Sequence, residues 1–304
     1  MTQIGRITVL TNPASGHGNA RRAAARAVTR FQQRGVDVCA IVGTDAEHAR
    51  RLVDEALEGG TDALVVVGGD GIISVALQSL ALGDVPLGII PAGTGNDHAR
   101  EFGLPAKDPE AAADIVVDGN IEVIDLGRIT GADGTDTWFG TVMAAGFDSL
   151  VTDRTNRMRW PHGRMRYNVA MLAELSKLRL LPFRLTFDGR ELLTELTLAA
   201  FGNTRSYGGG MLICPDADHS DGLLDVTMVQ SASRTRLIRL FPTVFKGTHV
   251  DLDEVRTERA KTITVDSPGI NAYADGEYAC PLPVEVSAVV GALKILRPAE
   301  RIAR

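Results

Sequence analysis

Cysteine is scarce in this chain, and the three cysteines that occur are far apart. Cys39, Cys214 and Cys280 form no closely spaced pair of the kind that binds zinc. A scaffold held by disulfides or by a structural zinc is therefore excluded. We expect the three thiols to stay reduced in the cytosol.

Long apolar runs are missing as well. No run reaches the ~18 residues of a membrane-spanning helix, and the N-terminus lacks the basic region, apolar segment and cleavage site of an export signal. The 304 residues are 44% hydrophobic and 23% charged, which is enough to bury a substantial core in two lobes. We expect a soluble, cytoplasmic protein.

Two common fingerprints of nucleotide binding are absent. The sequence has no Gly-x-x-x-x-Gly-Lys-Ser/Thr loop and no Gly-x-Gly-x-x-Gly that opens a helix. Two other glycine-rich turns follow apolar, strand-like stretches, in Val65–Gly71 and in Ile89–Asp97. Glycine lets backbone amides approach phosphate oxygens, and a helix that begins after such a turn adds its positive end.

Each of these turns holds a carboxylate, Asp70 or Asp97. Because a carboxylate repels phosphate unless a divalent metal lies between them, the pair predicts a metal-bound polyphosphate such as Mg-ATP. The glycines could instead serve only tight turns after parallel strands. Two such turns on successive strands of a doubly wound sheet open into one crevice, which favours the nucleotide site. Its expected residues are Gly68, Gly69, Asp70 and Gly71 in the first turn and Gly93, Thr94, Asn96 and Asp97 in the second.

Hydrophobic periodicity predicts an α/β first lobe and a mainly β second lobe. In the first lobe we expect strands at Ile7–Leu10, Val36–Val42, Leu64–Val67 and Leu87–Ile90, and helices at Asn19–Arg34 and Thr44–Leu57. Thr44 and Glu47 have the spacing of a capping box at the start of the second helix. Beyond Asp125 we expect strands at Thr137–Ala144, Phe183–Phe187, Glu195–Phe201, Leu224–Val229, Lys261–Val265 and Val284–Val289, with helices near Tyr167–Leu178 and Arg234–Phe245.

Four motifs, in this order, resemble the diacylglycerol kinase and sphingosine kinase superfamily of lipid kinases: Asn12-Pro13-Ala14-Ser15-Gly16, Gly68–Gly71, Gly93–Asp97 and Asp275-Gly276-Glu277. The resemblance covers nearly the whole chain and is closest to the soluble bacterial diacylglycerol kinases. The stretches Asn203–Gly210 and Trp160–Tyr167 are similar to the actinobacterial branch. The resemblance implies ATP-dependent phosphorylation of diacylglycerol to phosphatidic acid with Mg²⁺, and ATP contacts from Asn12 to Gly16 and from Thr44.

The resemblance also implies two domains and a homodimer. Residues 1–125 with about 290–304 would form a doubly wound, nucleotide-binding α/β domain on a parallel sheet, and residues 126–289 a lipid-binding β sandwich. Ala292–Leu296 is the expected strand that returns to the first lobe. We expect the active site between the lobes.

The strongest catalytic candidate lies in the late motif. Asp275-Gly276 between alternating segments is first of all a hairpin turn, but that explanation does not account for Glu277. Phosphoryl transfer to an alcohol needs a carboxylate near the attacking hydroxyl. The resemblance implies that Glu277 is the general base, with Asp275 as a supporting or alternative group. Asp70, in the first glycine turn, is the expected catalytic carboxylate beside the metal.

A second acidic cluster lies in Pro215–Leu223. It is not an EF-hand, because Asp221 stands where that loop needs glycine and the terminal glutamate is absent. From the residues alone it is a solvated turn before a strand. The resemblance implies a structural Mg²⁺ held by the Asp221 side chain and the carbonyls of Asp218 and Leu223.

Positive charge is concentrated in Arg154–Arg184, which contains seven arginines and one lysine but a single acidic residue, Glu174. The whole chain, in contrast, has a net charge of −6. Met158, Trp160, Met165, Tyr167 and Phe183 are interspersed. Docking to an anionic bilayer fits this pattern better than nucleic-acid binding, for which no motif is present. Contacts to ATP and structural ion pairs are alternatives. We therefore expect a cytoplasmic protein that binds the inner face of the membrane peripherally.

The chain departs from its family just after the first turn. The usual threonine, asparagine or histidine, and glutamate are replaced by Ile72, Ser74 and Val75. We expect an active kinase with altered nucleotide contacts. The alternatives are a kinase for sphingosine, ceramide or a glycolipid, and a pseudokinase that binds without turnover. NAD kinases and 6-phosphofructokinases share Gly-Gly-Asp-Gly, but no Asn-Glu pair of the former occurs here.

Overall fold

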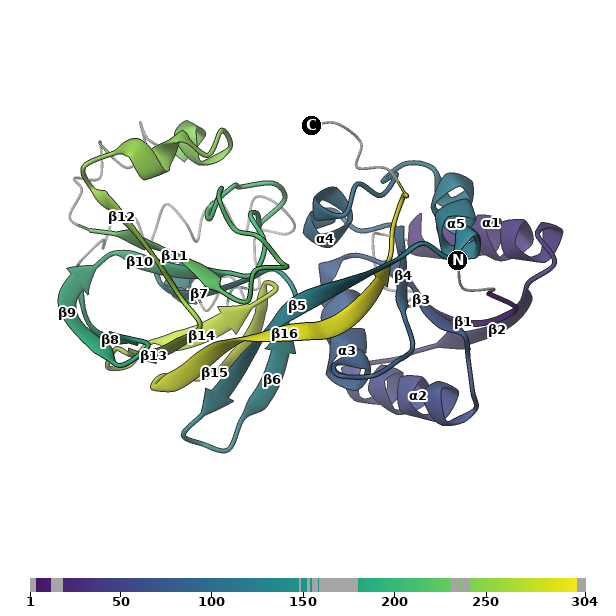
Figure 1. Cartoon of the computed structure of the whole chain (residues 1–304), viewed down its shortest axis with the longest axis horizontal. Coiled ribbons are helices and arrows are strands. Elements are labelled where there is room, and N and C mark those ends of the chain that lie inside the picture. The colour runs from purple at the N-terminus through teal and green to yellow at the C-terminus, as the bar shows by residue number, and fades with distance from the viewer. Residues whose placement is uncertain are drawn as a thin grey trace.

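The computed structural model describes residues 4–11, 19–147, 149–151, 180–230 and 241–299, together with positions 154, 158 and 236. These residues form two lobes joined by long strands (Figure 1). The first lobe is α/β and the second is mainly β, as predicted. Among the described residues, no helix combines the length and the apolar character needed to cross a bilayer.

The first lobe is built on a parallel sheet with the strand order β2-β1-β3-β4. Its strands are β1 (Arg6–Thr11), β2 (Asp37–Val42), β3 (Ala63–Gly68) and β4 (Leu87–Pro91), and its helices are α1 (Asn19–Gln33), α2 (Ala46–Glu58), α3 (Asp70–Leu80), α4 (Asp97–Glu101) and α5 (Pro109–Asp118). Val65 and Val67 pack on the side of α1 and α5, whereas Leu64 and Val66 pack on the side of α2 and α3. Helices therefore cover both faces of the sheet, and the doubly wound prediction is confirmed.

The second lobe is a sandwich of two sheets. Its strands are β6 (Asp136–Phe139), β7 (Val142–Gly146), β8 (Leu181–Phe187), β9 (Arg190–Leu196), β10 (Leu198–Gly202), β11 (Leu224–Val229), β12 (Val255–Ala260), β13 (Thr262–Asp266), β14 (Asn271–Ala274), β15 (Glu277–Pro281) and part of β16 (Val284–Leu296), with a 3₁₀ helix η2 (Thr248–Asp251). One sheet continues from the first lobe through β16, β13, β8 and β9, and the other has the order β12-β11-β10-β7-β14-β15. Phe183 and Ile263 from one sheet share a core with Phe201 and Val226 from the other, which confirms the predicted sandwich.

Two long strands, β5 (Ile121–Gly131) and β16 (Val284–Leu296), run antiparallel through both lobes (Figure 1). The expected return strand Ala292–Leu296 is the last part of β16, where Ile295 pairs in parallel with Leu87 of β4. A register irregularity between Val289 and Leu293 separates it from the earlier part of β16. The domain boundary expected near residue 125 falls inside β5. The division of the chain into two domains at that residue stays a prediction.

The predicted cap of α2 was wrong. The carboxylate of Asp45, not the Thr44 hydroxyl, accepts the hydrogen bond from the His48 amide, at 2.8 Å. Glu47 pairs with Arg51 at 2.8 Å. Two capping candidates stand next to each other here, and Asp45 has the spacing that reaches the free amide.

Two predicted strands are also divided. The segment Thr137–Ala144 breaks between Phe139 and Val142, so that β6 and β7 lie in different sheets. The segment Glu195–Phe201 is shared between β9 and β10. The helix expected near Tyr167–Leu178 lies outside the described residues, and within Arg234–Phe245 the described positions 236 and 241–244 are helical.

Candidate active site

The two glycine turns meet at the carboxyl ends of β3 and β4. These strands are parallel neighbours with Gly68 opposite Pro91, and the Ala92 amide donates to the Gly68 carbonyl at 2.8 Å. A Cβ added to Gly69 would lie 3.0 Å from the Cα of Gly93, and one added to Gly93 would overlap the Cα of Gly69. The turns converge as the sequence predicts, and only glycine permits this approach.

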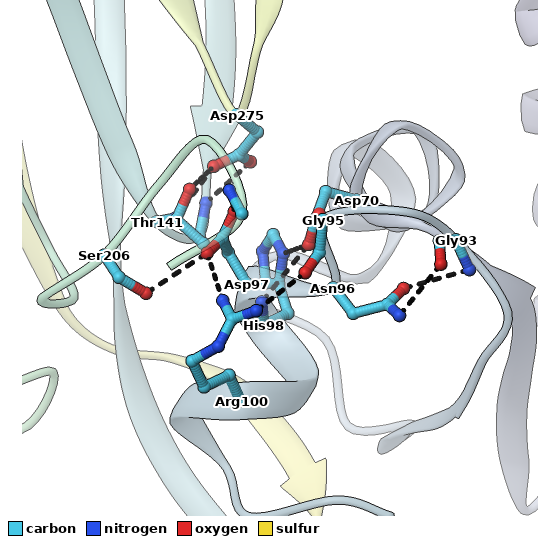
Figure 2. Close-up of polar contacts among 12 residues, drawn as sticks. Asp70, Gly93, Gly95, Asn96, Asp97, His98, Arg100, Thr141, Ser206 and Asp275 are labelled. Carbon is cyan, nitrogen blue, oxygen red and sulfur yellow. Dashed lines mark hydrogen bonds and ion pairs between the residues drawn. The ribbon is translucent and has the colours of Figure 1, made fainter. Parts of the chain in front are cut away.

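Asn96 closes the second turn on itself. Its side chain accepts a hydrogen bond from the Gly93 amide and donates one to the Gly93 carbonyl, each at 3.0 Å (Figure 2). The residue has a left-handed backbone with a φ of 53°, a conformation that asparagine tolerates better than most residues. Thr94, between these two residues, is exposed. The turn is thus held in one shape with its tip open to a ligand.

Asp70, the first residue of α3, is held by His98 of α4. One oxygen of the Asp70 carboxylate lies 3.0 Å from the His98 Nδ1 and accepts the His98 backbone amide at 3.2 Å (Figure 2). Burial alone would raise the pKa of Asp70, but the His98 ring and the backbone amides of His98 and Asp97 lower it to about 2. Asp70 is therefore a permanent anion at the mouth of the first turn.

Asp97 ties the first lobe to a glycine-rich loop of the second. Its buried carboxylate accepts hydrogen bonds from the amides of Gly209 at 2.7 Å and Gly210 at 2.8 Å, and from the Ser206 hydroxyl at 3.3 Å. It also pairs with Arg100 (Figure 2). Both carboxylate oxygens are thus engaged by the protein, and the expected contact of Asp97 with a metal or its waters stays a prediction.

Asp275, in the turn between β14 and β15, anchors that turn to the break between β6 and β7. Its carboxylate accepts the amides of Gly140 at 2.9 Å and Thr141 at 2.8 Å, and the Thr141 hydroxyl at 2.6 Å. The residue is buried. These bonds hold the turn that also carries Glu277.

Glu277, the first residue of β15, reaches from the second lobe to the first glycine turn. A Cβ added to Gly71 would lie 3.1 Å from the Oε1 of Glu277. The residue as a whole is exposed, so a substrate can reach it. Partial burial of the carboxyl group and the negative charge of Asp275 raise the pKa of Glu277 above its ordinary value. A carboxylate of raised pKa is a better proton acceptor.

The other predicted nucleotide contacts, Thr44 and Asn12 to Gly16, are not among the residues of the two glycine turns. Thr44 follows β2, two strands away from the turns, and its hydroxyl hydrogen-bonds to Asp45 at 3.0 Å and to the His48 ring at 2.9 Å. Asn12 to Gly16 lie outside the described residues. Ile72 is buried in the core that α3 shares with the sheet and with α2, and the half-buried Val75 packs against this core. Two of the three departures from the family pattern are therefore apolar side chains in contact with the core.

The predicted metal turn lies just before β11. One carboxylate and two carbonyls are oxygen donors of the type that Mg²⁺ prefers. In the structure, however, Asp221 pairs with Arg259 and accepts the Leu223 amide at 3.0 Å, and the Asp218 carbonyl accepts the Asp221 amide at 3.4 Å. No group of three acidic, histidine or cysteine residues within the described ranges could hold a metal. The donor types fit, but a metal ion would compete with Arg259.

The same turn is docked on Asp125 of β5. The Asp125 carboxylate accepts the amides of Gly222 and Gly291, each at 2.8 Å, and the Asp125 amide donates to the His219 carbonyl at 2.8 Å. This residue therefore joins the turn to both long strands. Sequence reasoning did not identify it.

The expected membrane-facing patch lies mostly outside the described residues. Phe183 is 2% exposed and belongs to the sandwich core, so its placement on that surface was wrong. Arg184, its neighbour on β8, points to solvent and lies 3.6 Å from Glu191. The alternation of β8 explains both positions.

Sequence reasoning also missed His98, Thr141, Ser206 and Arg100. His98 directly follows the second glycine motif, and this position was a usable signal. Arg100 stands three residues after Asp97, with which it pairs, so its spacing was a local signal as well. Thr141 and Ser206 reach the site only through contacts between distant segments, such as the one from Ser206 to Asp97, and no local spacing could have indicated them.

Comparisons with known proteins agree with this geometry. A family model described as the diacylglycerol kinase catalytic domain matches residues 6–129, and one described as the YegS C-terminal NAD kinase beta sandwich-like domain matches residues 141–297. A diacylglycerol kinase of Mycobacterium tuberculosis is 69% identical, over 97% of this chain and 96% of the relative. A diacylglycerol kinase of Bacillus subtilis is 28% identical, over 97% of each chain.

The fold comparison covers the same length. A solved structure from Bacillus anthracis, 22% identical, matches with a TM-score of 0.81 over 98% of this chain and 97% of the other. This likeness supports the arrangement of the lobes alone. With the two family models on the two lobes and the mycobacterial relative over almost the whole length, the chain belongs to the diacylglycerol kinase family, in its actinobacterial branch.

Proposed function

We propose that this chain is an ATP-dependent kinase that phosphorylates the free hydroxyl of diacylglycerol and produces phosphatidic acid. The acceptor oxygen bonds to the terminal phosphorus of ATP, the bond from that phosphorus to the bridging oxygen breaks, and ADP leaves. The acceptor proton passes to a base. The mycobacterial relative, 69% identical and named a diacylglycerol kinase, supports this acceptor.

The observation that carries the proposal is the position of Glu277 beside the first glycine turn. Its Oε1 would lie 3.1 Å from a Cβ on Gly71, the second residue of α3. The amino end of a helix offers free backbone amides and a positive partial charge to a phosphate. An acceptor hydroxyl that approaches a phosphate bound there would find Glu277 within reach, which supports Glu277 as the general base.

Asp70 and the two turns would hold Mg-ATP. The bound metal would neutralise charge on the triphosphate. Asp70 suits this role because its low pKa keeps the carboxylate ionised at neutral pH. Its Oδ2 also lies near the second turn, 2.9 Å from the position of a Cβ added to Gly95. Asn12 to Gly16, Thr44 and the amides of both turns are the proposed ATP contacts.

Diacylglycerol is a membrane lipid, so the protein would act from the cytoplasm on the inner face of the cell membrane and contribute to phospholipid synthesis. The excess of arginine in Arg154–Arg184 supports docking to an anionic surface, since each basic residue near such a surface contributes ~1 kcal/mol. Family resemblance supports a homodimer. No nucleic-acid partner is proposed.

One observation favours an alternative. On α3, the buried Ile72 and the half-buried Val75 stand where the family has polar groups, a replacement that a pseudokinase that binds nucleotide or lipid without turnover could tolerate. A kinase for sphingosine, ceramide or a glycolipid would share the same site and differ only in its acceptor.

The test is an assay of phosphoryl transfer from labelled ATP with Mg²⁺ and mixed micelles. Diacylglycerol, sphingosine and ceramide are offered separately, with NAD and fructose 6-phosphate as soluble controls. Label in phosphatidic acid alone would support the proposal. Label in another product would reassign the acceptor, and no transfer despite nucleotide binding would favour the pseudokinase.

A further inference from the structure

His98 is a buried histidine at the junction of the two lobes. It is the second residue of α4 and is 2% exposed. Asp70 contacts its ring from α3, and Gly140 lies against it from the segment between β6 and β7. The other charged groups that act on it are Asp97, its neighbour on α4, and Asp275 from the turn between β14 and β15.

His98 binds one specific oxygen of Asp70. The ring Nδ1 lies 3.0 Å from Oδ1, and the backbone amide donates to the same Oδ1 at 3.2 Å. Two contacts from one residue fix the torsion of the carboxylate. The Oδ2 atom is thereby turned to the second glycine turn, where it would lie 2.9 Å from a Cβ on Gly95.

The surroundings of the ring keep it in this orientation. A Cβ added to Gly140 would overlap the His98 Nε2, so the absence of a side chain at Gly140 makes room for the ring. Nε2 is buried and has no hydrogen-bond partner among the described residues. An unpaired buried nitrogen is unfavourable because it has lost its hydrogen bond to water, so packing alone does not explain a histidine at this position. The hydrogen bond of the His98 ring is made by Nδ1, to Asp70.

We propose that His98 is a positioning residue for nucleotide use: it orients Asp70 so that Oδ2 faces the site of the triphosphate and its metal. This inference rests on the proposed function, in which Asp70 serves Mg-ATP. His98 itself touches neither substrate. Its loss should therefore act on the nucleotide and leave the lipid side unchanged.

The test compares His98→Ala with His98→Asn. The asparagine amide can place a nitrogen close to the position of Nδ1, whereas alanine removes the contact. Loss of a residue that orients a metal-binding carboxylate typically costs about 10–100-fold in affinity or activity. We expect His98→Ala to lower kcat/KM for Mg-ATP by about this factor with an unchanged KM for diacylglycerol, and His98→Asn to recover most of the loss.

His249 provides a matched control. It is another buried histidine, on η2, and its Nε2 contacts the Ile213 carbonyl at 3.0 Å, within the second lobe. We expect His249→Ala to lower the melting temperature without changing KM for Mg-ATP. Equal effects of His98→Ala on both substrates, or equal losses in His98→Ala and His98→Asn, would overturn the proposal.

A double-mutant cycle with Asp70→Asn tests whether His98 acts through Asp70. The loss in the double variant should be close to that of Asp70→Asn alone, and additive losses would contradict the proposal. The dissociation constant of a non-hydrolysable ATP analogue with Mg²⁺, measured by calorimetry, gives the same comparison without turnover. If wild type phosphorylates no lipid, the proposed function fails, while this constant still decides the role of His98.

Discussion

Thr141 donates two hydrogen bonds to one carboxylate oxygen of Asp275, from its backbone amide at 2.8 Å and from its hydroxyl at 2.6 Å. The other oxygen accepts the Gly140 amide at 2.9 Å. Both oxygens of Asp275 are thus used to hold the turn that carries Glu277. The two carboxylates of the late motif therefore differ: Asp275 is buried and anchors the turn, whereas Glu277, the proposed base, is exposed.

Replacement of Asp275 by alanine should destabilise the protein. The variant leaves the buried amides of Gly140 and Thr141 without their acceptor, and an unsatisfied buried donor costs about 1–3 kcal/mol. Urea unfolding should show this loss, and Thr141→Val, which removes only the hydroxyl, should show a smaller one. An unchanged unfolding midpoint in Asp275→Ala would contradict the anchoring role.

Replacement of Gly93 by alanine should separate the two glycine turns. The new Cβ would overlap the Cα of Gly69, which is backbone and cannot rotate away. Overpacking of this kind typically costs about 1–3 kcal/mol, and the affinity for the ATP analogue should fall with it. Gly5→Ala is the control, because its Cβ would meet only Asp62 at an ordinary 3.5 Å. Equal behaviour of the two variants would show that the close approach is unimportant.

The pH dependence of kcat should reflect Glu277. A general base must be deprotonated, and burial and Asp275 raise its pKa above the ordinary 4.5. Activity should therefore fall as the pH drops through a value above 4.5. Because Asp275 contributes to the shift, Asp275→Asn should move the acidic limb to lower pH in whatever fraction remains folded. An acidic limb below the ordinary glutamate pKa would argue against Glu277 as the titrating group.

The acidic turn at Asp221 can be tested for Mg²⁺ by thermal unfolding. If the turn binds the ion, Mg²⁺ should raise the melting temperature of the wild type and not that of Asp221→Asn. If the pair with Arg259 is the only role of Asp221, both should respond to Mg²⁺ alike. Arg259→Met is the complementary variant, since it frees the carboxylate and should increase the response to Mg²⁺ only in the first case.

Much of the fold follows from local patterns in the sequence. The buried strands β3 and β4 are short, largely apolar runs; β3 ends in Gly68 and β4 is followed closely by Gly93, and parallel neighbours bring their carboxyl ends together. The meeting of Gly69 and Gly93 was therefore predictable. The order of the elements in the α/β lobe was predictable for the same reason.

The contacts between distant segments were not predictable. Asp97 of the first lobe meets Gly209 and Gly210 of the second, and Asp275 meets Gly140 within the second lobe, each across more than a hundred positions of the chain. Such contacts depend on how separately patterned segments pack. The break in Thr137–Ala144 was missed because only Gly140 and Thr141 separate its two apolar stretches, and the pairing of these stretches with different sheets divides the strand there.

The most direct test of the proposed reaction is single-turnover transfer of label from ATP to diacylglycerol by wild type and Glu277→Gln. A general base typically contributes about 10²–10⁴ in rate. The rate should therefore fall at least about a hundredfold in the variant, while the dissociation constant of the ATP analogue stays the same. A near-normal rate of transfer in Glu277→Gln would remove Glu277 from the reaction.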